Sequence, residues 1–87
     1  MKSYNSAFEL LTDDPAVVKL LTMKSLLMDS IVDEMHELRI NQVQAAKIMK
    51  VTQPRVSNLK NGRISKFSYE MLFLMNERVI KHKGELK

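Results

Sequence analysis

The stretch QVQAAKIMKVTQPRVSNLKN, residues 42–61, decides the fold. A helix can begin directly after Asn41, because Asn41 and Gln44 have the spacing of a capping box, in which each side chain bonds the other residue's main-chain N–H. We expect this helix to continue to about Lys50. The small side chain of Ala46 would let a second helix cross it closely.

A second helix is expected over residues 52–61. Thr52 can cap its start, Pro54 falls in its first turn, where Pro is tolerated, and Gly62 can adopt the left-handed conformation that ends a helix. Val51 would pack under the turn between the two segments. Two short helices at this spacing predict a helix-turn-helix.

The second of these helices is expected to have one buried and one exposed side. Val56 and Leu59 form the buried stripe, and the helical step of about 100° turns the polar residues outward. Gln and Asn can pair with adenine, Pro54 can touch a thymine methyl, and Arg55 on the flank suits a phosphate better than guanine. The predicted DNA contacts are Gln42, Gln44, Thr52, Gln53, Pro54, Arg55, Ser57, Asn58, Lys60, Asn61 and Arg63.

Charge is distributed unevenly along the chain, whose net charge is +4. Residues 37–66 carry seven Lys and Arg against one Glu, whereas residues 1–36 carry three Lys against six Asp and Glu. Because basic clusters attract phosphate backbones, the central block favours a nucleic-acid partner. Charge alone leaves open the alternative of a solvated basic face without a partner.

The N-terminal part of the chain predicts a short helix and then a long one. Ser6 and Glu9 match a capping box that would start the short helix. An acidic cap and Pro15 start the long helix, which should run to about Arg39, with a break near Thr22–Ser25 as the alternative. Its apolar stripe is Leu20, Leu27, Ile31, Met35 and Leu38.

The C-terminal part predicts one more helix, which begins at Ser65 or Ser68, followed by a basic tail that frays. Methionines here and in the long helix are expected mainly to fill the core. Apolar residues nevertheless extend beyond one stripe on both helices, and such leftover surface indicates a second copy or another protein partner. The residues concerned are Met23, Leu26, Met28, Met71, Phe73, Leu74 and Met75.

What the sequence lacks excludes several classes of function. No Cys is present, which excludes disulfides and thiolate chemistry. Neither an apolar run of about eighteen residues nor the apolar core of a signal peptide occurs, so we expect a cytoplasmic protein with no membrane contact. Asp33 and His36 lack the spacing of a metal-binding helix, and no activated nucleophile or Gly-rich phosphate loop is evident. We therefore predict no enzyme activity, no catalytic or metal site, no cofactor and no small-molecule substrate.

Residues 38–63, LRINQVQAAKIMKVTQPRVSNLKNGR, resemble the lambda-repressor-like (XRE) helix-turn-helix family. The resemblance lies in the patterns Q-x-x-A-A and V-T-Q-P-R-V-S-x-L and in the Gly that follows; with Phe8-Glu-Leu-Leu and Pro15, nearly the whole chain looks like the small single-domain branch that includes HigA-type antitoxins. It implies an all-α, compact bundle of about five helices with a long N-terminal helix, which dimerises on a pseudo-palindromic operator. It assigns DNA contacts to Gln42, Gln53, Arg55, Ser57 and Asn58.

Lys50 departs from the family pattern, which usually has Gly in the turn. A left-handed backbone there would cost a non-Gly residue about 1 kcal/mol. We expect one helix-turn-helix domain over residues 1–87, made of an N-terminal segment at 1–13, the helix-turn-helix at 42–61 and a frayed tail at 81–87.

Two functional hypotheses of different classes follow. The first is a sequence-specific regulator of transcription: a dimeric repressor, and the antitoxin of a toxin-antitoxin pair that autoregulates its operon. The alternative is a protein-interaction module that mainly neutralises a RelE/HigB-like toxin, with DNA binding secondary, because the acidic N-terminal third would favour docking on a basic enzyme. A third interpretation is a helix-turn-helix that serves only as a packing unit.

Overall fold

The computed structural model describes residues 12–86, and within that range the chain is helical with no strand. The elements are α2 (Pro15–Leu38), α3 (Gln42–Met49), α4 (Gln53–Lys60), the short 3-10 helix η1 (Ile64–Lys66) and α5 (Tyr69–Glu85). The all-α prediction is confirmed. The short helix expected at Ser6–Glu9 lies outside the described residues.

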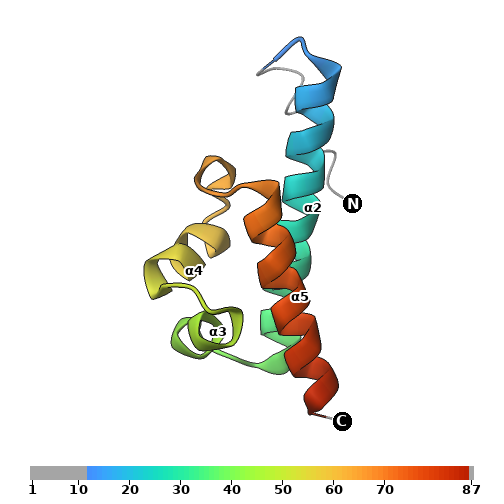
Figure 1. Cartoon of the computed structure of the whole chain (residues 1–87). Coiled ribbons are helices and arrows are strands. Elements are labelled where there is room, and N and C mark those ends of the chain that lie inside the picture. Colours follow the sequence, from blue (N-terminus) through green and yellow to red (C-terminus); the bar gives the residue numbers. More distant parts are fainter. Residues whose placement is uncertain (1–11, 87) are drawn as a thin grey trace.

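Two long helices form the spine of the molecule (Figure 1). α2 and α5 run side by side in the same direction, and α3 and α4 pack together against one flank of this pair. The beginning of α2 extends beyond the other helices, so the molecule is elongated, with extents of 43 × 25 × 20 Å. Ser30 of α2 donates a hydrogen bond from Oγ to Oδ1 of Asn76 on α5 at 2.9 Å.

The helix ends follow from local sequence chemistry. Asp14 caps α2 by accepting from the N–H of Ala16 at 2.9 Å, and Pro15 occupies the first helical position. α2 is continuous, so the alternative of a break near Thr22–Ser25 is excluded. α5 begins after Ser68, whose Oγ accepts from the N–H of Met71, because residues 64–66 form the 3-10 helix that the sequence did not predict.

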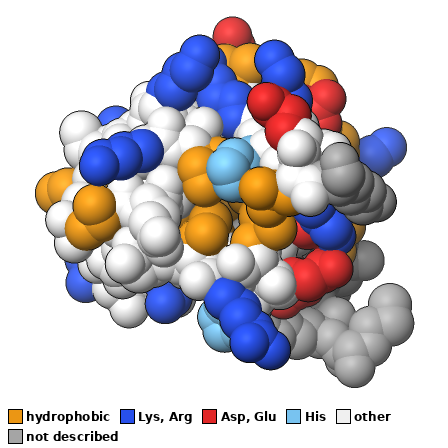
Figure 2. All heavy atoms as spheres, turned by 90° about the horizontal axis from the view of Figure 1, so that it is seen from below, with side chains coloured by type: hydrophobic (Ala, Val, Ile, Leu, Met, Phe, Trp, Pro, Cys, Tyr) orange, Lys and Arg blue, Asp and Glu red, His pale blue; other side chains and the backbone are white. Residues whose placement is uncertain are grey.

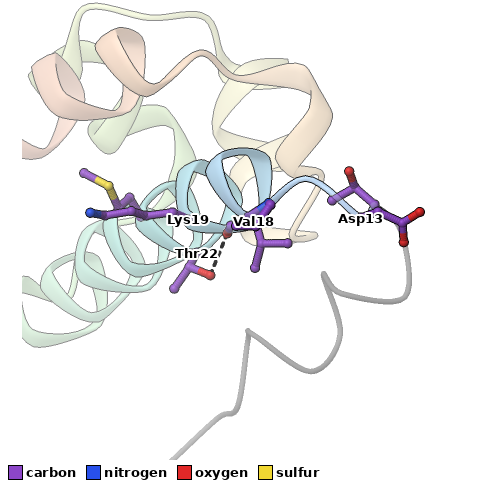
Figure 3. Close-up of a pocket in the computed structure, with 7 residues that line it drawn as sticks. Asp13, Val18, Lys19 and Thr22 are labelled. Atoms are coloured by element: carbon purple, nitrogen blue, oxygen red, sulfur yellow. Dashed lines mark hydrogen bonds between the residues drawn. The ribbon is translucent and has the colours of Figure 1, made fainter.

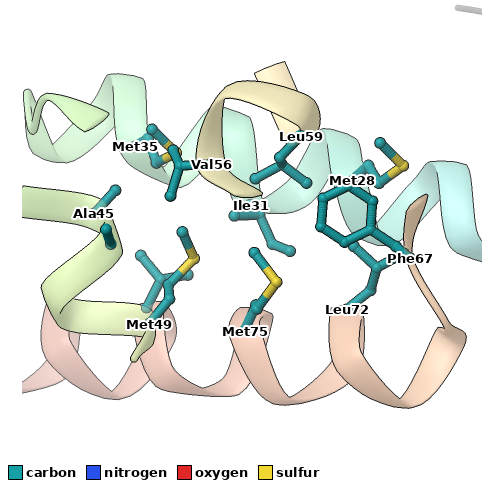
Figure 4. Close-up of a cluster of buried hydrophobic side chains, with 12 residues drawn as sticks. Met28, Ile31, Met35, Ala45, Met49, Val56, Leu59, Phe67, Leu72 and Met75 are labelled. Carbon is teal, nitrogen blue, oxygen red and sulfur yellow. The ribbon is translucent and has the colours of Figure 1, made fainter. Parts of the chain in front are cut away.

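The core lies between the α2–α5 pair and the two short helices (Figure 4). Ile31 and Met35 of the predicted α2 stripe are buried, but Leu20 is 45% exposed, which corrects that part of the prediction. The reason is geometric, because Leu20 belongs to the part of α2 that extends past the bundle. The central core consists of Met28, Ile31, Met35, Ala45, Ala46, Met49, Val56, Leu59, Phe67, Leu72, Met75 and Val79. Met28 and Met75 were expected among the leftover apolar residues, and that part of the prediction is wrong because both side chains are buried between the helices.

The C-terminal end of α5 is tied to the end of α2. The helix continues to Glu85, where we expected a frayed tail from Lys81 onward. Lys83 Nζ lies 3.1 Å from Glu34 Oε2 and 3.0 Å from Glu37 Oε1, so two carboxylates of α2 hold this segment in place. The hydrogen bond to Glu37, followed by the one to Glu34, raises the pKa of Lys83 above its ordinary value of 10.5.

The turn after α3 contains a strained residue. Lys50 has φ 59° and ψ 45°, the left-handed conformation, and its N–H bonds the carbonyl oxygens of Ala46 and Lys47. A side chain in this conformation costs about 1–2 kcal/mol, whereas Gly adopts it freely. The resemblance to a family that usually has Gly at this position therefore predicted the left-handed backbone conformation of Lys50 correctly.

Replacing Lys50 by Gly should stabilise the protein. Relief of the left-handed strain is offset by the greater entropy of Gly in the unfolded chain, so the free energy of unfolding should rise by about 0.5–1 kcal/mol in urea titrations. The control is Lys47→Gly inside α3, which should lower it by about 1 kcal/mol. A loss of stability in Lys50→Gly would contradict the assigned backbone conformation.

Candidate nucleic-acid interface

α3 and α4 form a helix-turn-helix with a tight connection. The N–H of Val51 donates to the carbonyl oxygen of Ala46 at 3.0 Å, which closes the end of α3. Ala46 is 7% exposed and belongs to the shared core, which is consistent with its predicted place at a close helix crossing. Only residues 50–52 separate the last residue of α3 from the first of α4, so the position of α3 determines that of α4.

α4 buries one side and exposes the other. Val56 and Leu59 are 0% and 2% exposed, which confirms the predicted inward stripe. At the N-terminal end, Thr52 Oγ1 accepts from the N–H of Arg55 at 3.3 Å. Gln53 and Pro54 are exposed beside this cap. The end of α4 that recognition helices normally present to base edges is therefore open to solvent.

The predicted contact residues lie on α3, α4 and the segment that follows α4. Ser57 and Asn58 are half-buried, and Gln42 is half-buried at the first position of α3. The residues that the sequence singled out therefore lie on α3, on α4 or directly beside the ends of α4. The exposed members are Gln44, Thr52, Gln53, Pro54, Lys60, Asn61 and Arg63.

Besides Thr52, which caps α4, two members of this set are engaged within the protein. Gln44 Oε1 accepts from the N–H of Asn41 at 2.9 Å, while Asn41 Oδ1 accepts from the N–H of Gln44 at 2.8 Å, which confirms the capping box. The half-buried Arg55 donates from Nη1 to the sulfur of Met71 on α5. Both side chains therefore support the helix-turn-helix, and any contact of Arg55 with DNA requires its guanidinium to leave α5.

Electrostatics favour an anionic partner on this side of the molecule. No Asp or Glu occurs between Glu37 and Glu70, a range that includes α3, α4 and η1. Figure 2 shows the molecule from below, and its left part, which carries α3 and α4, bears blue basic side chains and no red acidic ones. Phosphate groups would be attracted to this surface, and salt would weaken the attraction.

A family model described as a helix-turn-helix domain matches residues 10–79, a range that contains both short helices and most of the α2–α5 pair. The chain belongs to this helix-turn-helix family. No match is found among curated proteins or among solved structures. As a member of the family, the protein is a DNA-binding protein, and regulation is the role that such a domain suggests.

A hollow of about 640 Å³ lies at the start of α2, away from the helix-turn-helix (Figure 3). The sequence did not predict it. Thr22 on its wall donates from Oγ1 to the carbonyl oxygen of Val18 at 2.8 Å. Among the described residues, those that line it come from one short stretch, which is separate from the α3–α4 surface. They are Thr12, Asp13, Pro15, Val18, Lys19, Thr22 and Met23.

Over residues 12–86, no group of three or more His, Cys, Asp or Glu side chains is arranged to hold a metal ion. None of the helices in that range combines the length and apolar character that a membrane span requires.

Gln44 and Gln53 should respond differently to replacement by Ala. Gln44→Ala removes half of the capping box and should lower the free energy of unfolding by about 0.5–1 kcal/mol. Gln53 is exposed, so Gln53→Ala should change stability by less than about 0.5 kcal/mol. Thermal or urea unfolding measures both, and equal losses would contradict the structural role assigned to Gln44.

Proposed function

We propose that the protein is a sequence-specific regulator of transcription that contacts base edges with the exposed side of α4. The observation that carries this proposal is the burial of Val56 and Leu59, which turns Gln53 and Asn58 away from the core at the end of a helix-turn-helix. Amide side chains can bond adenine bidentately, and a mismatch at such a contact costs about 1–3 kcal/mol. The acid-free surface around α4 supplies the attraction for the DNA backbone.

The proposed contacts divide by chemistry. Thr52, Gln53 and Asn58 are assigned to base edges, with Pro54 against a thymine methyl. The exposed charged residues at the C-terminal end of α4, Lys60 and Arg63, are assigned to phosphates and set the register without specifying sequence. Gln42 at the start of α3 is assigned to another phosphate, and Gln44, Arg55, Ser57 and Asn61 are proposed as further DNA contacts.

We further propose that the protein acts as a dimeric repressor, as the lambda-repressor-like (XRE) resemblance implies. Two copies would place their α4 helices about 34–36 Å apart, one turn of DNA, on a pseudo-palindromic operator. Exposed apolar side chains on α2 and α5 support association with a second copy or another protein, since Leu26 is 56% and Phe73 45% exposed.

Selection from a randomised DNA duplex pool at near-physiological salt tests this function. A two-fold symmetric motif should be enriched, with half-sites about 10–10.5 base pairs apart. If the retained sequences show no motif and the affinity for DNA merely decreases as the salt concentration rises, sequence-specific regulation is excluded. The protein would then be a nonspecific DNA binder.

Point variants test the assignment of individual residues. Gln53→Ala and Asn58→Ala should each weaken binding to the enriched duplex by about 1–3 kcal/mol and barely affect a scrambled duplex. Lys60→Met should weaken binding to both duplexes and reduce the salt slope by about 1. Fluorescence anisotropy titrations at several salt concentrations measure these differences, and uniform losses in all variants would contradict the assignment to base edges.

A second candidate is a HigA-type antitoxin that neutralises a basic toxin of the RelE/HigB-like class and binds DNA at its own operon. The observation in its favour is that exposed Leu26 lies on α2, which carries four Asp and Glu against two Lys and is therefore suited to a basic partner, with exposed Phe73 on the neighbouring α5. Replacing Leu26 and Phe73 by Ser should abolish binding to such a toxin and leave the affinity for a duplex with a single half-site, which needs no second copy, unchanged. Loss of both activities together would contradict separate surfaces.

A further inference from the structure

Arg78 connects α5 to the turn of the helix-turn-helix. Its Nη1 donates a hydrogen bond to the main-chain carbonyl oxygen of Met49 at 3.0 Å, and its side chain is partly buried. Met49 is the last residue of α3 and precedes Lys50, the residue with the left-handed backbone. Arg78 therefore contacts the main chain at the point where it turns from α3 toward α4.

The Met49 carbonyl is one of the groups that a helix end leaves without a partner. The carbonyl oxygens of Ala46 and Lys47 accept the N–H groups of Lys50 and Val51, which close the helix. Arg78 supplies the donor for Met49, and its positive charge also suits the partial negative charge of a helix C-terminus. The guanidinium is thus held at the end of α3 by a hydrogen bond and by electrostatic attraction.

The buried residues of α3 and α5 are all apolar. Met49 of α3 and Met75 and Val79 of α5 are all 0% exposed in the shared core. Apolar contacts are non-directional, and methionine side chains adapt to small shifts. A hydrogen bond has a narrow range of distances and angles, so the bond from Arg78 restricts how far α3 can slide or rotate on α5.

We propose that Arg78 is a positioning residue for sequence recognition: it fixes the orientation of α3 on α5, and through the short connection of residues 50–52 it fixes the N-terminal end of α4. This inference rests on the proposed use of α4 in base recognition, but it assigns a role to a residue outside the α4 surface. Loss of the bond would misplace Thr52 and Gln53 without removing any group that touches DNA.

The first test needs no DNA. Residual dipolar couplings of backbone amides report the orientation of α3 and α4 relative to α2 and α5. They should differ between the wild-type protein and Arg78→Met, while Lys81→Met, which removes one exposed positive charge three residues later on α5, should reproduce the wild-type values. Unchanged couplings in Arg78→Met would overturn the proposal whatever the protein binds.

The second test compares affinity for the enriched duplex with affinity for a scrambled duplex of the same length. Arg78→Met should reduce this ratio about tenfold, the effect of one poorly placed base contact, with the salt slope unchanged. Arg78→Lys keeps a charged donor and should restore part of the ratio, which keeps the test valid if Arg78→Met folds poorly. Lys81→Met should leave the ratio unchanged.

Two outcomes of the second test would overturn the proposal. An equal loss of affinity for both duplexes, with a salt slope smaller by about 1, would make Arg78 a phosphate contact. The other outcome is a lower melting temperature of Arg78→Met with an unchanged ratio of the two affinities, where the affinities are measured well below the melting temperature. In that case Arg78 would be a structural residue only. If no duplex is enriched, the proposed function fails while the dipolar couplings still decide whether Arg78 positions α3.

Discussion

Burial of one side of α4 is the constraint on which the rest of the structure depends. An eight-residue helix is not stable alone in water, so α4 exists because Val56 and Leu59 insert between α2, α3 and α5 (Figure 4). The same insertion fixes the rotation of α4 about its axis. Which side chains face solvent, and hence which can touch DNA, is therefore decided by core packing and not by the polar residues themselves.

The short helices depend equally on what closes their ends. α3 is bounded by the Asn41–Gln44 capping box and by the left-handed Lys50, and α4 begins at the Thr52 cap. These groups lie on the same surface as the proposed DNA contacts. Gln44 and Thr52 consequently serve stability first, because their side-chain oxygens accept main-chain N–H groups in the free protein. A surface that combines capping and recognition in this way tolerates few substitutions.

Much of this arrangement could be predicted from the sequence because its causes are local. Caps, the Pro in the first turn of α4 and the spacing of Val56 and Leu59 act within a few residues, and all were confirmed. Leu20 is exposed because the beginning of α2 extends beyond the other helices. The helical periodicity of the sequence does not show where this overhang begins. Local patterns place Leu20 and Ile31 in one stripe, but only tertiary structure determines which part of a stripe is covered.

The contacts made by arginines were missed for a related reason. Arg55 lies on α4 like the residues around it, yet its guanidinium is directed to Met71 on α5, and Arg78 reaches back across 29 residues to Met49. A long side chain can reach several neighbouring elements, so its partner depends on the packed fold. No spacing pattern in the chain distinguishes Arg78 from Lys81, one turn later, which is exposed. The residues that position the recognition helix are therefore harder to predict than those it presents.

The most direct measurement of the central claim is an NMR titration of the labelled protein with a short DNA duplex. If the exposed side of α4 contacts DNA, the amide resonances of Thr52, Gln53 and Asn58 should shift most, and those of Leu26, Phe73 and Ile80, on the α2–α5 pair, should stay in place. Shifts concentrated on α2 and α5, with α4 unaffected, would contradict it.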